Sequence, residues 1–426
     1  MSEPINEYQL DNGLKILLKE IHTAPIISHW VWYQVGSRYE KPGQTGISHW
    51  VEHMQFKGTP AFPAGILDKA ISRDGGVWNA FTHLDWTTFF ETMPADKIDL
   101  SIALEADRMV NSLFDPEEVE SERTVVISER EGSENDPLFL LDEAVQMAAF
   151  QHHPYRHEVI GSIEDLKAIT RNELYEHYRK YYNPANAVVT VAGDFDTAEM
   201  LDKIKAAYGG LKGQPLSPLN LLREDKLAGE QHVDVYGPGE TTYLQIAYRA
   251  PAAKENDFFA FTILDSLLTG PNSLNMFGGG SISNKTSRLY RRLVEKEFAI
   301  SVNGSLQATV DPYIYTISIT VHPDHSTQEV LEQVDQELDR LRQHWATQAE
   351  VERAAKQARA LFVYGSENIT NQGFWLGYSE IFAQYSWFLN YTDKLSRITA
   401  DDVRNILHQY LNPAQRVIGI YHPEEA

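Results

Sequence analysis

Two stretches of the chain repeat one pattern. Residues 169–188 read ITRNELYEHYRKYYNPANAV and residues 398–417 read ITADDVRNILHQYLNPAQRV, an alignment without a gap at a constant offset of 229. In each copy a threonine with an acid three residues later predicts a helix start, and Asn-Pro-Ala ends that helix before an apolar strand. The chain is therefore expected to consist of two similar halves, each of about 200 residues.

The joint between the halves is expected where the sequence becomes polar and proline-bearing, at Pro215-Leu216-Ser217-Pro218 and the charged run 223–226. We assign residues 1–216 to an N-terminal half, 217–232 to a linker and 233–426 to a C-terminal half. Asp11-Asn12-Gly13 indicates a hairpin, and residues 188–191 and 315–321 read as strands. Strands mixed with long helices and joined by hairpins indicate the α+β class.

The segment His49-Trp50-Val51-Glu52-His53 places two imidazoles and a carboxylate on one helix face, because residues three and four apart are neighbours there. Two such histidines can bind one tetrahedral ion, and the carboxylate can take a proton from water at an open coordination position. The order is that of the inverzincins. An exposed helix with polar residues is the alternative interpretation of these five residues.

A third ligand is expected from a later helix. Asp115-Pro116-Glu117-Glu118 has a capping residue, a proline at the first helical position and a capping-box glutamate, so a helix is expected to start there. Residues seven apart drift only about 20° around a helix, so Glu122 and Glu129 share one face. One of them can bind the metal and the other can orient a ligand.

These motifs together resemble the M16 (pitrilysin-like) metallopeptidases, particularly the short members similar to mitochondrial processing peptidase. Residues 46–48 and 54–59 flank the histidine motif as the family's flanks do, and residues 75–82, 123–129 and 134–137 extend the match. The resemblance implies two related α+β halves, each with a mainly antiparallel sheet and flanking helices, enclosing a chamber. It also implies a zinc-dependent endopeptidase that hydrolyses peptides or unfolded polypeptides.

The resemblance implies a role for each residue that matches the family pattern. His49, His53 and Glu129 are expected to bind one zinc ion per chain; Glu129 lies 76 residues beyond His53, as the family's third ligand does. Glu52 is expected to be the general base. Glu122 is expected to complete the catalytic set in a supporting role, holding a histidine ring nitrogen or the approach of water. An ordinary solvated helix face is the alternative for Glu122.

Trp78-Asn79-Ala80-Phe81 resembles the family's substrate strand. An extended peptide can add to an exposed sheet edge through backbone hydrogen bonds. Asn79, Ala80 and Phe81 are therefore expected to bind substrate, with Asn79 orienting the scissile carbonyl or its neighbour. For the side chains of Trp78 and Phe81, packing in the core is the alternative.

One departure from the family pattern concerns the second half. Where self-sufficient members carry a substrate-gripping arginine and, seven residues later, a tyrosine, this chain has Val294 and Ile300, which donate no hydrogen bonds. We therefore expect the chain to be the zinc-bearing subunit of a heterodimer whose related partner supplies the arginine and tyrosine. Nearby arginines and tyrosines are the alternative source: Arg291, Arg292, Tyr313 and Tyr315.

Two further features of the second half bear on function. The apolar helix expected at residues 258–268 contains no histidine and reads as core. The glycine-rich segment around Gly278-Gly279-Gly280 lacks the Lys-Ser/Thr sequel of a phosphate-binding loop, so we expect a flexible loop over the chamber or a plain solvent loop.

The competing function class is a structural or assembly subunit, because family relatives in respiratory complexes keep the fold without the zinc residues.

Composition sets limits on these expectations. The chain has no cysteine, which leaves histidine and carboxylate as metal ligands. A net charge of −23 argues against binding of nucleic acid, and acidic residues near the site would favour basic or neutral peptides. No apolar run is long enough for a membrane span, and the N-terminus shows no targeting signal, so a cytoplasmic location is expected.

Overall fold

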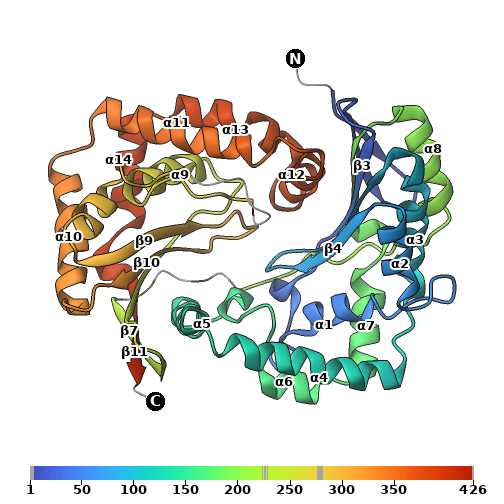
Figure 1. Ribbon diagram of the computed structural model, residues 1–426, viewed down its shortest axis with the longest axis horizontal. Helices are drawn as coiled ribbons and strands as arrows, with labels where there is room; N and C mark the ends of the chain where they lie inside the picture. Colours follow the sequence, from blue (N-terminus) through green and yellow to red (C-terminus); the bar gives the residue numbers. More distant parts are fainter. Residues whose placement is uncertain (1–3, 223, 225–226, 228, 276–281, 425–426) are drawn as a thin grey trace. The chain divides into compact units, whose positions relative to one another are not determined.

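The computed structural model describes residues 4–222, 224, 227, 229–275 and 282–424 (Figure 1). They form two compact units. The first unit comprises Met1–Glu131, His157–Leu221 and Glu367–Phe388, and the second comprises Gly132–Arg156, Leu222–Ser366 and Leu389–Ala426. Each unit has one β-sheet with helices packed on it, which confirms the α+β class.

The sheet of the first unit has the strand order β1-β2-β6-β3-β5-β4 in the described part of the chain. β2 and β6 are parallel, and every other neighbouring pair is antiparallel. β4 therefore lies at one edge of the sheet. The expected hairpin joins β1 to β2, and its Gly13 adopts φ 92°, which only glycine reaches without strain. The strands are β1 Asn6–Gln9, β2 Lys15–Glu20, β3 Ile26–Tyr33, β4 Val77–Thr82, β5 Thr87–Pro94 and β6 Ala187–Gly193.

The sheet of the second unit repeats this topology. Its order is β7-β11-β8-β10-β9, with β7 and β11 parallel and the other pairs antiparallel. β7, β11, β8, β10 and β9 thus take the places of β2, β6, β3, β5 and β4. The strands are β7 Gln231–Pro238, β8 Tyr243–Arg249, β9 Ala299–Leu306, β10 Ile314–Val321 and β11 Arg416–Glu424.

The repeat found in the sequence corresponds to one helix and one strand of each unit. Thr170 caps α7 (Arg171–Tyr181) and Thr399 caps α14 (Ala400–Tyr410), each through a complete capping box. Each helix is followed by a short turn and then by the equivalent strand, β6 or β11. The expected duplication is therefore confirmed at the level of secondary structure and topology.

The other helices surround the two sheets. Those of the first unit are α1 Ile47–Met54, α2 Ile66–Arg73, α3 Ile98–Asn111, α4 Pro116–Ser133, α6 Ile163–Ala168, α8 Thr197–Tyr208 and α12 Ile369–Phe382, with α13 Tyr385–Arg397 crossing between units. Those of the second unit are α5 Pro137–Ala149, α9 Asp257–Leu268, α10 Thr327–Gln343 and α11 Gln348–Tyr364. Short 3₁₀ or π turns occupy Ser37–Tyr39, Ala95–Lys97, Pro154–Arg156, Pro184–Asn186, Tyr290–Val294 and Pro413–Gln415.

Each half of the sequence gives one helix to the other unit. α12, near the red end of the colour scale in Figure 1, packs on β2, β3 and β6 of the first unit. α5 packs on the equivalent strands β7, β8 and β11 of the second unit. Each compact unit therefore contains segments from both halves of the sequence. The boundaries expected at residues 216 and 233 concern the two repeated halves of the sequence, and they stay a prediction.

Two glycines explain how α12 fits against the first sheet. A Cβ atom on Gly373 would lie 2.7 Å from Nε1 of Trp30, and one on Gly377 would lie 1.9 Å from Nε1 of Trp32. Because the glycines are four residues apart, they share one helix face, which rests on the two tryptophans of β3. The other face of β3 faces the core of the first unit, so the strand is buried on both sides.

Parts of the predicted linker and loop lie outside the described residues, namely Arg223, Asp225, Lys226 and Gly278–Gly280. Within the linker, the Glu224 carboxylate accepts the backbone N–H groups of residues 151–153. Residues 258–268 of α9 are all buried, as expected for a core helix. In the part of the chain that the structure describes, no helix has the length and apolarity needed to cross a membrane.

Candidate metal centre

Helix α1, which carries the histidine motif, is anchored by a carboxylate from outside the helix. Its N-cap residue Gly46 has φ 86° and no side-chain cap. The buried Glu40 carboxylate instead accepts the backbone N–H groups of Gly46 and Ser48, each at 2.9 Å. Ser48 Oγ also lies 3.2 Å from Nε2 of His177 on α7. These contacts fix the first turn of α1 immediately before His49.

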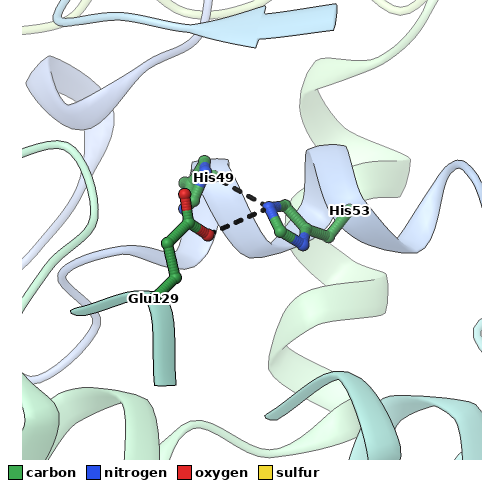
Figure 2. Close-up of side chains that lie close together, drawn as sticks. All are labelled: His49, His53 and Glu129. Atoms are coloured by element: carbon green, nitrogen blue, oxygen red, sulfur yellow. Dashed lines mark hydrogen bonds and ion pairs between the residues drawn. The ribbon is translucent and has the colours of Figure 1, made fainter. Parts of the chain in front are cut away.

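The three predicted metal ligands come together at this helix (Figure 2). Nε2 of His53 lies 3.3 Å from Nε2 of His49 and 3.6 Å from Oε2 of Glu129. Two of the groups come from α1 and the third from α4, which starts at Pro116 as the sequence predicts. The faces that helix periodicity predicted for these residues therefore meet, and their binding of a metal stays a prediction.

The three groups fit a zinc ion. Zinc bonds of about 2.0 to 2.1 Å at tetrahedral angles put neighbouring ligand atoms about 3.4 Å apart, close to the separations observed. Burial lowers the pKa of His49 to about 3, so its imidazole is neutral, as a metal ligand must be. Nδ1 of His49 is buried and has no hydrogen-bond partner among the described residues. Two histidines and one carboxylate also form a ligand set of catalytic zinc sites.

Glu122 orients His53. Its Oε1 lies 2.8 Å from Nδ1 of His53, so Nδ1–H donates to the carboxylate and the lone pair of Nε2 points toward His49 and Glu129. Burial opposes the charged form of His53, but the hydrogen bond that His53 donates to Glu122 and the nearby carboxylates outweigh it and raise the pKa of His53. Lys57 contacts the other oxygen of Glu122. The supporting role expected for Glu122 is the one this geometry favours.

Glu52 lies on α1 beside the histidines, where a general base is expected. Its Oε2 accepts a hydrogen bond of 2.7 Å from Oγ1 of Thr82, at the end of β4. Burial raises the pKa of Glu52 to about 7, although the Thr82 hydrogen bond opposes the shift. A divalent cation beside it would favour the carboxylate form. Without the ion, Glu52 therefore exchanges a proton near neutral pH.

The predicted substrate strand is the edge strand β4. Asn79 is exposed, Ala80 is buried, and Phe81 is partly buried and stacked on Phe90. Oδ1 of Asn79 accepts the backbone N–H of Ala80 at 2.9 Å. Trp78 packs on Phe56 with a ring-centroid distance of 5.0 Å. Trp78 and Phe81 both pack on neighbouring aromatic rings, as the alternative interpretation expects, and substrate binding by Asn79, Ala80 and Phe81 stays a prediction.

Sequence reasoning did not assign roles to three residues of the site. Lys57 lies beyond the end of α1 at Met54, so no helix periodicity marks it. Thr82 reaches the site only through the tertiary fold, and Glu40 reaches Gly46 and Ser48 across an irregular segment that no capping pattern describes.

The second unit lacks the substrate-gripping pair in its expected place. Ile300, which stands in the tyrosine position, lies on β9 and is 56% exposed. Of the alternative residues, Tyr313 and Tyr315 are buried, and the Tyr315 hydroxyl donates to Asp265 at 2.7 Å. Arg292 donates to Gln336. Arg291 is exposed and remains the alternative within this chain.

Comparison with known proteins gives two family models and full-length relatives. "Insulinase (Peptidase family M16)" matches residues 15–162, and "Peptidase M16 inactive domain" matches residues 168–358. An uncharacterized zinc protease of Streptomyces coelicolor is 28% identical over 430 residues, 98% of this chain and 90% of its own. The crystal structure of a protease from Helicobacter pylori has a TM-score of 0.91 at 25% identity, covering 99% of this chain and all (100%) of that one.

A chain in the structure of complex III2 from Candida albicans shares the fold, with a TM-score of 0.79 at 16% identity over 98% of this chain and 96% of that one.

A duplicated α+β fold with a metal-type cluster in the first half is the architecture of a class of peptidases. The chain belongs to the M16 peptidase family, and relatives that match it along most of its length are named zinc proteases.

Proposed function

We propose that this protein is a zinc-dependent endopeptidase. The observation that carries the proposal is the convergence of His49, His53 and Glu129 at separations suited to one zinc ion, with Glu52 beside them on the same helix. A metal-binding module without catalysis would not need Glu52, which is not one of the clustered ligands. One zinc ion per chain is expected, held by these three side chains.

The side chains of the site divide the work of hydrolysis. When bound, zinc supplies Lewis acidity toward water and the scissile carbonyl. Glu52 takes a proton from the attacking water and delivers it to the leaving amine nitrogen. Glu122 keeps the ring of His53 in the tautomer that directs Nε2 toward the metal. A peptide adds to the edge of β4 through its backbone, and Asn79 orients the scissile carbonyl or its neighbour.

The protein is further proposed to be the catalytic subunit of a heterodimer. Ile300 and Val294 cannot donate hydrogen bonds to a peptide, and Tyr313 and Tyr315 are buried. A related partner chain would supply the missing arginine and tyrosine. Full activity of the purified chain, with no gain from any partner, would refute this part and direct attention to Arg291. The cytoplasmic location and the enclosing chamber stay predictions.

The proposal is tested with the zinc-loaded chain and a mixed library of unfolded peptides. Chelator-sensitive cleavage that disappears in Glu52→Gln is the expected result, with the partner added if the chain alone is silent. Glu117→Gln on exposed α4 is the matched control and should cleave as the wild type does. Purified protein with a zinc content near zero would overturn the proposal and favour a structural or assembly subunit, as the shared fold of the complex III2 chain allows.

A further inference from the structure

We propose that a second cavity of the first unit is an effector site for a small organic anion with two acidic groups, coupled to the metal centre through the 3₁₀ turn Ser37–Tyr39. This inference goes beyond the proposed peptidase function, because it assigns a binding site made of residues that the metal centre does not use. The ligand is recognised by two cations, each held against its own aromatic ring.

The cavity is large enough for a small organic molecule. Its volume is about 590 Å³, within the range of pockets that bind small ligands. Arg38 and Tyr39 of the 3₁₀ turn form one wall, and Lys180 and Tyr181 at the end of α7 form a second. Residues 214–220, where the linker begins, complete it. All of these residues belong to the first unit.

The cavity is positively charged in an acidic protein. The chain has a net charge of −23, yet no described residue of the cavity lining is acidic, and Arg38 and Lys180 are cations. Lys180 is exposed, its Nζ donates to the Tyr181 hydroxyl over 2.9 Å, and it forms no ion pair with a described carboxylate. Nε of Arg38 lies 3.7 Å from the buried carboxylate of Asp85, but a guanidinium has five N–H donors. The lining therefore favours an anionic ligand.

The two positive charges are held separately. The Arg38 guanidinium lies 5.5 Å from the centroid of the Tyr39 ring, and Nζ of Lys180 lies 4.5 Å from that of Tyr181. The two tyrosine rings are neighbours, edge to face, with centroids 5.6 Å apart. A molecule with an acidic group at each end can meet both cations, and the amide side chains of the lining can bind polar atoms between its ends.

The 3₁₀ turn that walls the cavity is tied to both sides of the metal centre. It is followed directly by Glu40, whose carboxylate holds the first turn of α1. The backbone N–H of Arg38 donates to the carbonyl of Leu84 over 2.8 Å. Leu84 comes two residues after Thr82, which donates to Glu52. An anion that restrains this turn also restrains the supports of α1 and of Glu52, so binding of the anion and of zinc should favour each other by one common factor.

Isothermal titration calorimetry of the full, zinc-free chain at constant ionic strength tests the site without any need for catalysis. The probes are straight-chain dicarboxylates from succinate to pimelate, with butyrate and inorganic phosphate for comparison. One dicarboxylate should bind at one site per chain, on the order of tenfold more tightly than butyrate or phosphate. Lys180→Gln should lose this preference. Lys212→Gln, at an exposed lysine that is not among the lining residues, is the matched control and should keep it.

Three results would overturn the site. They are no saturable binding of any dicarboxylate, equally tight binding of butyrate or phosphate, and an equal loss of affinity in Lys180→Gln and Lys212→Gln.

A second titration tests the coupling. The zinc Kd is measured with and without a saturating amount of the best dicarboxylate, and the anion should lower it by about fivefold or more relative to the same comparison in Lys180→Gln. That variant corrects for zinc chelation by the carboxylates in solution. An unchanged ratio, with anion binding intact, would refute the effector role. Because neither titration measures cleavage, a chain that shows both effects and cleaves no peptide would support this inference and count against the peptidase proposal alone.

Discussion

Replacing Glu122 by alanine tests whether this carboxylate positions a metal ligand. In the native structure Nδ1–H of His53 donates to Glu122 over 2.8 Å, which selects the tautomer with a free Nε2. Without the acceptor, the His53 ring is free to rotate or to change tautomer. Both alternatives move the Nε2 lone pair away from His49 and Glu129. Restoring the orientation on binding would make the free energy of zinc binding less favourable.

The expected loss follows from the type of hydrogen bond. A hydrogen bond to a charged group contributes about 1.5 to 3 kcal/mol, and 1.4 kcal/mol corresponds to a factor of ten. Zinc affinity should therefore fall roughly 10- to 100-fold in Glu122→Ala, in line with the usual effect of losing such a partner. Glu122→Gln keeps an acceptor oxygen for His53, so its loss should be several times smaller than that of the alanine variant.

Competition with a chromophoric chelator at constant pH measures the zinc Kd of each variant, independently of activity. Glu118→Ala is the matched control, because Glu118 lies one turn earlier on α4 and is 3.6 Å from Lys57, without a hydrogen bond to His53. The reasoning is refuted if Glu122→Ala binds zinc as tightly as the wild type, or if Glu118→Ala loses as much affinity.

Three further predictions concern stability. Gly377→Ala should destabilise the fold by about 1 to 3 kcal/mol, because its methyl group would collide with Trp32. Gly132→Ala, in open space on α4, should be neutral or stabilising by up to about 1 kcal/mol. Urea unfolding of both variants checks this. Burial lowers the pKa of His177 to about 3, so the unfolded chain takes up a proton below pH 6.5 that the native protein does not. The unfolding free energy should therefore fall by up to about 1.4 kcal/mol per pH unit between pH 6.5 and pH 3, and a series of urea titrations should show a shallower slope for His177→Gln. Chelation should lower the Tm of the zinc-loaded protein, since the ion binds the folded state. Glu52→Gln should show a drop in Tm of similar size on chelation, because Glu52 is not a ligand. Equal Tm values with and without chelator would contradict zinc binding at this site.

The parts of the site that the sequence predicts are those with a local signal. Spacings of three, four and seven residues placed Glu52 with His49 and His53, and Glu122 with Glu129, and the helices have the expected faces. The capping boxes of the repeat likewise marked two equivalent helices, and through them the shared topology of the sheets. Each of these signals depends on neighbours within about two helical turns.

The parts that were not predictable depend on tertiary packing. An apolar helix such as α12 reads the same whichever sheet it covers, so its exchange with α5 is invisible in the local pattern. The contact that fits α12 to its sheet joins Gly373 and Gly377 on that helix to two tryptophans more than 300 residues earlier in the sequence. Glu40 precedes Gly46 by only six residues, but it reaches the first turn of α1 across an irregular segment, and no capping rule describes that contact.

The second unit shows why the fold alone does not make a peptidase. α9 follows β8 and packs on α14 and β9, as α1 follows β3 and packs on α7 and β4. Yet residues 258–268 of α9 are buried, and the Asp265 carboxylate accepts hydrogen bonds from Tyr315 and Thr269 within the unit. Its polar groups are thus used for internal packing, and the described residues contain one metal-type cluster, that of α1 and α4. Since one topology holds a candidate site in one copy and a filled core in the other, catalysis has to be argued from side chains. A measured stoichiometry of one zinc ion per chain is the expected consequence, and two tightly bound ions would contradict this account of the second unit.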